Sequence, residues 1–191
     1  MFVLIVLLVL IAVGVVAGAG IYNRLVALKH RVVTSWSNIS VLLKQRHDEL
    51  PKLVETCRQY MKYEPETLER VMQARAAVFS AQETADPTVL GAAEGALRAQ
   101  LGKLFAVAEA YPELKANSSF QHLQSRISGL ETAIAGRRET YNDAVNMSNA
   151  SIEQFPANIV AGFGSFRRFD LLEFADGETA DVDVKALFDS K

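Results

Sequence analysis

Hydrophobic positions are concentrated at the start of the chain. Residues 1–23 carry no charged side chain, and 19 of them are hydrophobic. Folded as a helix, residues 2–21 would be about 30 Å long, which equals the hydrocarbon thickness of a bilayer. This pattern predicts a transmembrane anchor over residues 1–21.

A cleaved signal peptide is the alternative interpretation, because Ala17-Gly18-Ala19 has the small-x-small form that signal peptidases accept. Against it, no Lys or Arg precedes the apolar run, and the run shows no separate hydrophobic core region. Five basic residues lie between the anchor and the first acid, Asp48: Arg24, Lys29, Arg31, Lys44 and Arg46. Positive charge stays on the cytoplasmic side. We therefore expect a single-pass membrane protein with its N-terminus outside and its folded domain in the cytoplasm.

Gly14 and Gly18 form a GxxxG pair inside the anchor. Such a pair permits close approach of two helices and dimerisation within a membrane. Glycine is also common in membrane helices, so incidental small residues are the alternative explanation. We name Gly14 and Gly18 as candidate residues for transmembrane self-association.

After Tyr22 the hydrophobic residues follow a helical period. The first stripe predicts a long helix that continues the anchor to about Tyr60, interrupted by a kink at Pro51, where proline removes a helical hydrogen bond. Two shorter helices are expected over residues 66–83 and 90–107. A second long helix, with Ser118 as its N-cap, extends to about residue 155 and keeps a hydrophobic seam over five heptads.

These patterns predict an all-α fold, in which the transmembrane helix continues into an antiparallel four-helix bundle over residues 22–156, with two long and two shorter helices. In up-down-up-down order, the fourth helix returns to the end at which the first leaves the membrane. Arg137 alone breaks the fourth-helix seam. We expect it to form a polar layer with Glu131 and Arg138 against Asp48 or Glu55.

The chain changes character twice after the bundle. Residues 157–169 are apolar and aromatic with two arginines, whereas residues 170–191 carry seven acids against two lysines and are predicted to be a flexible tail. The candidate membrane-interface contacts are Phe163, Phe166, Arg167, Arg168 and Phe169. Packing of this segment on the end of the bundle is an equally open alternative.

Charge and residue types exclude several classes of protein. A net charge of −2 argues against a strongly basic nucleic-acid binder, and the single cysteine, Cys57, excludes an intramolecular disulfide and a cysteine-only zinc site. The three histidines lie far apart, and no ExxH or HExxH motif occurs. We expect no catalytic residues, no metal, no cofactor and no enzymatic activity.

Several motifs, in order, make the chain resemble the LemA family of bacterial membrane proteins over about residues 21–166. They are Tyr22-Asn23-x-Leu25-Val26-x-Leu28, Trp36-Ser37-Asn38-Ile39, Arg46-His47-Asp48-x-Leu50-Pro51, Tyr111-Pro112-x-Leu114-Lys115-Ala116-Asn117, Arg138-x-x-Tyr141-Asn142-x-Ala144-Val145 and Phe155-Pro156.

The resemblance implies one N-terminal membrane helix and an antiparallel helical bundle, and it implies no established enzymatic site. The family includes a magnetosome-associated branch, which suggests a role in membrane organelles. Ser148, Gln45 and Leu130 depart from the residues usual in the family. These departures put in doubt any polar interaction built on those side chains.

We expect a membrane-anchored structural scaffold that self-associates through its anchor and long helices to organise or shape the membrane. Its partners would be the lipid bilayer and further copies of the chain, and no nucleic acid. The alternative is a membrane-tethered adaptor that presents its helical bundle to a cytoplasmic protein of unknown identity.

Overall fold

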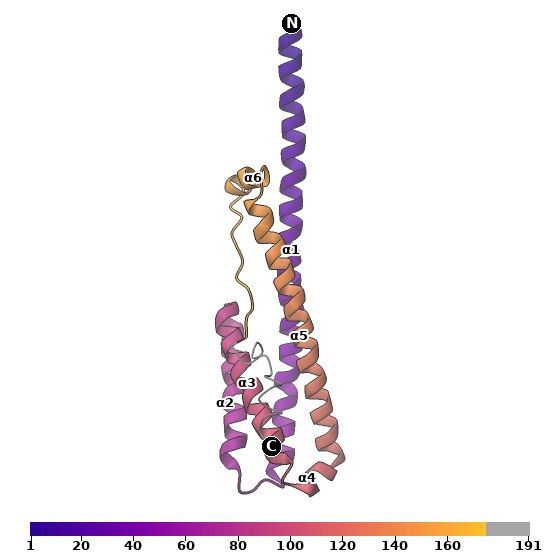
Figure 1. The fold of residues 1–191 in the computed structure, drawn as a ribbon, viewed down its shortest axis with the longest axis vertical. Coiled ribbons are helices and arrows are strands. Elements are labelled where there is room, and N and C mark those ends of the chain that lie inside the picture. The colour runs from indigo at the N-terminus through magenta and orange to yellow at the C-terminus, as the bar shows by residue number, and fades with distance from the viewer. Residues whose placement is uncertain (175–191) are drawn as a thin grey trace, which may run out of the picture. The chain divides into compact units, whose positions relative to one another are not determined.

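The computed structural model describes residues 1–174, which contain six α-helices and no strand (Figure 1). The helices are α1 (Phe2–Arg58), α2 (Pro65–Thr84), α3 (Pro87–Ala108), α4 (Pro112–Ala116), α5 (Ser118–Glu153) and α6 (Ala157–Phe163). The predicted all-α class is confirmed, as is the long apolar helix at the N-terminus. Two compact units divide the described residues: residues 1–46 with 128–171, and residues 47–127 with 172–174.

In the first unit, α1 packs on α5 through an aromatic contact and an ion pair. The rings of Trp36 and Tyr141 lie 5.3 Å apart, and Nη1 of Arg46 lies 2.5 Å from Oε1 of Glu131. From Trp36 to Arg46 the residue numbers on α1 increase, whereas those of their partners on α5 decrease from Tyr141 to Glu131. The contacts along these two stretches of helix therefore follow opposite order.

The buried cation of this contact is Arg46, with 1% of its surface exposed, and not the predicted Arg137, which is exposed. The α-helix has 3.6 residues per turn, and Ile134 is buried. Arg138, four residues later, therefore lies closer to the buried face of α5 than Arg137, three residues later. Arg138 is accordingly the half-buried residue of the pair. The prediction placed a polar layer at Glu131 but assigned it the wrong arginine.

The second unit contains the hairpin of α2 and α3, which contact each other and are joined by two residues. Ala85 ends α2 in the left-handed region with φ 53°. Oδ1 of Asp86 then accepts hydrogen bonds from the backbone N–H groups of Thr88 (2.8 Å) and Val89 (3.4 Å), which caps α3. The two shorter helices predicted over residues 66–83 and 90–107 are confirmed, and α3 begins three residues earlier than predicted.

Helix α1 continues through Pro51 without the predicted interruption. Proline has no N–H, so the carbonyl of His47 lacks its usual helical donor. Nε of Arg75, on α2, donates to this carbonyl instead, at 2.9 Å. Leu50 and Leu53 on either side are fully buried, which contributes about 1.5–3 kcal/mol each and offsets the cost of proline in a helix.

Two further details differ from the prediction. Asn117, not Ser118, caps α5, because its Oδ1 accepts a hydrogen bond from the backbone N–H of Phe120 at 3.0 Å. The short helix α4, which begins at Pro112, was not predicted from the pattern. A single turn of helix is too short to show a hydrophobic period.

The packed chain extends past the composition boundary at residue 169. Leu172 is 1% exposed, and a Cβ built on Gly91 of α3 would lie 1.8 Å from the carbonyl oxygen of Glu173. The guanidinium carbon of Arg98, also on α3, lies 5.1 Å from the ring centre of Phe174. The start of the acidic segment therefore packs against α3, and the rest of the predicted flexible tail, residues 175–191, lies outside the described residues.

Replacing Arg75 by Met should lower the free energy of unfolding by about 1–3 kcal/mol, because it leaves the His47 carbonyl unsatisfied. Pro51→Ala restores a backbone N–H that can bond to the same carbonyl. The cost of Arg75→Met should therefore be smaller in the Pro51→Ala background. Denaturant unfolding of the four full-length proteins in detergent, followed by circular dichroism, measures the difference. Arg75 also contacts the His47 ring, and Arg75→Met removes that contact in both backgrounds. If Arg75→Met lowered the free energy of unfolding equally in both backgrounds, Arg75 would not be the donor that replaces the missing N–H of Pro51.

Two glycines of α3 should respond to alanine in opposite ways. An added Cβ meets nothing within 4 Å at Gly102, so Gly102→Ala should stabilise the protein by about 0.5–1 kcal/mol through helix propensity. Gly91→Ala should destabilise it, because the new methyl group would overlap the backbone of Glu173. Thermal unfolding of both variants tests this. Equal stabilisation would mean that the segment from Leu172 does not lie against α3.

Candidate membrane-contact site

The apolar start of α1 has no covering segment among the described residues. Every residue from 1 to 17 is exposed. Within the first unit, this part of α1 extends past α6 (Figure 1). This part of α1 is long and apolar enough to cross a membrane, by length and composition, and none of it is buried. A continuous apolar surface of this kind marks a contact with lipid or with another protein.

Gly14 and Gly18 lie on this uncovered part of α1. A Cβ added at either position would meet nothing within 4 Å. Residues four apart share one face of a helix, so the two glycines form a small-residue strip that no described part of the chain fills. Their role in self-association stays a prediction.

Directly after the anchor, Tyr22 contacts the segment that follows α6. Its ring and that of Phe166 meet edge to face, with centres 5.6 Å apart and planes at 71°. A Cβ built on Gly164 would lie 2.5 Å from the Phe166 ring and 3.4 Å from the Tyr22 ring, so only glycine permits this approach. Ser165 follows with φ 54°, in the left-handed region. The turn thus places Phe166 at the level of α1 where the uncharged anchor ends.

The three candidate phenylalanines occupy different surroundings. Phe163, at the end of α6, is 89% exposed, whereas Phe166 and Phe169 are half-buried. The backbone N–H of Phe169 donates to Oδ1 of Asn149 (3.0 Å), and its carbonyl accepts from Nδ2 of the same side chain (2.9 Å). Packing on the chain therefore accounts for Phe166 and Phe169, and it leaves Phe163 open for an external contact.

The two candidate arginines also have different surroundings. Nη2 of Arg168 pairs with Oε1 of Glu153 at 2.9 Å, with both side chains more than half exposed. Arg167 instead borders a pocket of about 220 Å³ that it shares with Lys29 of α1 and Ser148 of α5. No local sequence pattern could have shown that Lys29 and Arg167 border the same pocket, because the two residues lie near opposite ends of the chain.

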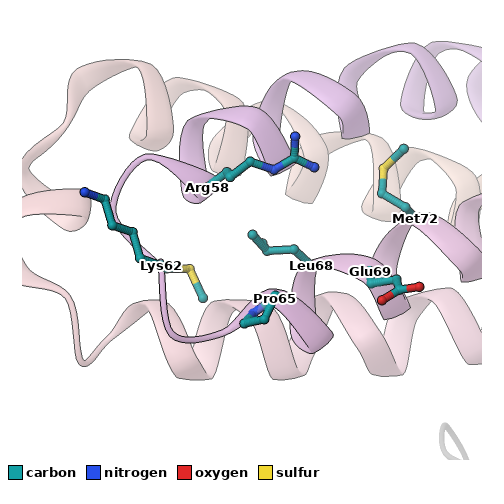
Figure 2. A pocket seen from close by; sticks show the side chains of 7 residues that line it. Arg58, Lys62, Pro65, Leu68, Glu69 and Met72 are labelled. Atoms are coloured by element: carbon teal, nitrogen blue, oxygen red, sulfur yellow. The ribbon is translucent and has the colours of Figure 1, made fainter.

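A larger pocket of about 550 Å³ lies in the second unit, where α1 ends and α2 begins. Figure 2 shows Arg58, from the end of α1, and Leu68, from α2, on opposite sides of it. Its lining residues are Arg58, Met61, Lys62, Pro65, Leu68, Glu69 and Met72. The lining combines two thioethers, Met61 and Met72, with the charged groups of Arg58, Lys62 and Glu69.

Burial holds two titratable groups of the core, Cys57 and Tyr141, in their neutral forms. Cys57 is fully buried, and burial raises the pKa of its thiol from 9.0 to about 12. Burial, with a smaller effect of the Asp170 charge, raises the pKa of Tyr141 from 10.0 to about 12, and its hydroxyl donates to the Asp170 carbonyl at 2.9 Å. Within residues 1–174, no three His, Cys, Asp or Glu side chains are placed to hold a metal ion. Cys57 is thus a protonated core residue at neutral pH.

Comparisons with known proteins agree with the residue motifs. The chain is 26% identical over 166 residues to "Protein LemA" of Metamycoplasma hominis, which covers 86% of this chain and 74% of that protein. It is 33% identical over 81 residues to "Magnetosome protein MamQ 2" of Paramagnetospirillum magneticum, which covers 42% of this chain. This chain spans only 30% of the length of that magnetosome protein.

The sequence profile of the LemA family matches residues 35–186. The match begins after the anchor, includes α2 to α6 and continues into the acidic segment. The matched region therefore includes the buried residue Leu172 as well as the helices. With this match over most of its length, the chain belongs to the LemA family.

Proposed function

We propose that this chain is a membrane-anchored structural scaffold, which self-associates through its anchor and long helices and thereby organises or shapes the bilayer. The uncovered apolar surface of α1 is the observation that carries this proposal. Lipid and a second copy of the same helix are the partners that suit an uncharged helix with a small-residue strip at Gly14 and Gly18.

The continuity of α1 supports a mechanical link between anchor and folded part. A single helix of 57 residues, about 85 Å long, contains the anchor and enters both units with no loop between them. A rotation or tilt of the anchor in the bilayer would be passed along this helix. Association of anchors would in turn bring the folded parts of neighbouring copies together.

We propose further that α1, α2, α3 and α5 pack as an antiparallel four-helix bundle. The opposite order of contacts along α1 and α5 supports this arrangement, as does the two-residue connection between α2 and α3. A bundle of this kind needs no catalytic group, metal or cofactor to act as a scaffold. Placement of Cys57 in the core, away from solvent, is consistent with such a role.

The anchor is proposed to cross the bacterial inner membrane with its N-terminus outside, because the basic residues that follow it stay in the cytoplasm. Protease added to spheroplasts should then leave residues 22–191 intact, and protease added after lysis should degrade them. A tag placed after Lys191 reports the result on immunoblots. Digestion from outside would reverse the proposed orientation.

Replacing both Gly14 and Gly18 by Leu should weaken self-association roughly tenfold, equivalent to about 1.4 kcal/mol, because bulky side chains separate the helix backbones. Gly20→Leu is the matched control, since residue 20 lies about 200° around the helix from residue 18. The mass of full-length protein extracted in nanodiscs measures association. Electron tomography of cells that overproduce each variant measures membrane shape.

Wild type and the Gly20 variant should form oligomers and alter membrane shape, and the double variant should lose both properties. A monomeric wild type that leaves membranes unchanged would overturn the scaffold. If that monomer captured a cytoplasmic protein, and lost it on removal of residues 175–191, the chain would be an adaptor instead.

A further inference from the structure

The pocket beside Arg167 lies where α1, α5 and the turn after α6 meet, all within the first unit. Its volume is about 220 Å³. Six residues line it: Lys29, Ser148, Ser165, Phe166, Arg167 and Phe169. They come from three segments that are distant in sequence, so the pocket is a product of folding.

The chemistry of the lining suits a phosphate group with an apolar attachment. Lys29 and Arg167 supply two positive charges, and Ser148 and Ser165 supply hydroxyl donors. The rings of Phe166 and Phe169 form an apolar wall. Among the described residues, no acidic side chain lines the pocket. The nearby carboxylate of Glu153 is paired with Arg168, which lies outside it.

The frame of the pocket is held before any ligand arrives. Phe166 is fixed by its contact with the Tyr22 ring, and Phe169 by two hydrogen bonds to Asn149. Ser148 is buried on α5. Only the two flexible cations must become ordered on binding, which keeps the entropic cost of binding small.

Position along α1 indicates where the ligand comes from. Lys29 lies eight residues after Ile21, so its Cα is about 12 Å beyond the end of the anchor. Side chains on a helix lean toward its N-terminus, and a lysine stem extends its ammonium further in that direction, toward the membrane. The headgroup layer is about 5–7 Å thick on each side of the hydrocarbon. The ammonium of Lys29 can therefore reach the level of the lipid phosphates.

We propose that this pocket binds the headgroup of an anionic phospholipid from the leaflet at which α1 leaves the membrane. Lys29 and Arg167 neutralise the headgroup, Ser148 and Ser165 offer hydrogen bonds, and the phenylalanines contact the start of the lipid chains. The proposal rests on the membrane anchoring of α1 and is independent of self-association. Each copy of the chain would thus bind one anionic phospholipid in preference to neutral lipids.

Native mass spectrometry of the full-length protein in detergent, titrated with phosphatidylglycerol, phosphatidylcholine or inorganic phosphate, tests the proposal. Wild type should bind phosphatidylglycerol roughly tenfold more tightly than phosphatidylcholine, and Arg167→Gln or Lys29→Gln should remove that preference. Arg167→Lys, which keeps the charge, should retain it. Arg168→Gln is the matched control, with the same loss of charge at the next residue, and should change affinity by less than about twofold.

Equal effects of Arg167→Gln and Arg168→Gln would replace the pocket by general charge attraction and overturn the proposal. Competition by inorganic phosphate at the same concentration as the lipid would also overturn it, since the site would then take soluble anions. Equal affinity of the wild type for phosphatidylglycerol and phosphatidylcholine would overturn the proposal as well. The same spectra report oligomer mass, so lipid selection by a monomer would refute the scaffold and leave the pocket intact.

Discussion

The structure depends on one unbroken hydrogen-bonded helix, α1, which carries an uncharged anchor at one end and enters both folded units at the other. At Pro51 the backbone of α1 provides no N–H for the His47 carbonyl. Arg75 provides that donor from α2. A side chain of a neighbouring helix thus replaces the backbone donor that proline lacks, so the continuity of α1 at Pro51 is supported by packing within the second unit.

Much of the fold could be predicted from hydrophobic period alone, because helix packing dictates which positions are apolar. The cap that Asp86 provides for α3 is a local feature of the same kind, although the hydrophobic period alone did not predict it. Errors arose where a distant partner decides the outcome. The donor to His47 comes from α2, and the partner of Glu131 is Arg46 on α1. Neither could be identified from residues near it in sequence.

The candidate site divides in the same way. Composition identified the anchor and the Phe/Arg segment, and the return of the fourth predicted helix placed them at one end of the first unit, as Tyr22 and Phe166 now show. Composition could not tell which rings pack inward, because that depends on the left-handed turn at Ser165 and on Asn149. Packing therefore accounts for Phe166 and Phe169, and membrane contact stays a prediction for Phe163.

The sealed environment of Cys57 has a practical consequence for spectroscopy. Its thiol is fully buried and, with a pKa of about 12, stays protonated at neutral pH, so thiol reagents have almost no thiolate to attack. No other cysteine occurs in the chain. A reporter cysteine introduced at exposed Phe163 would therefore be labelled almost alone in the folded protein, and a fluorophore or spin label there would report on the surroundings of the end of α6.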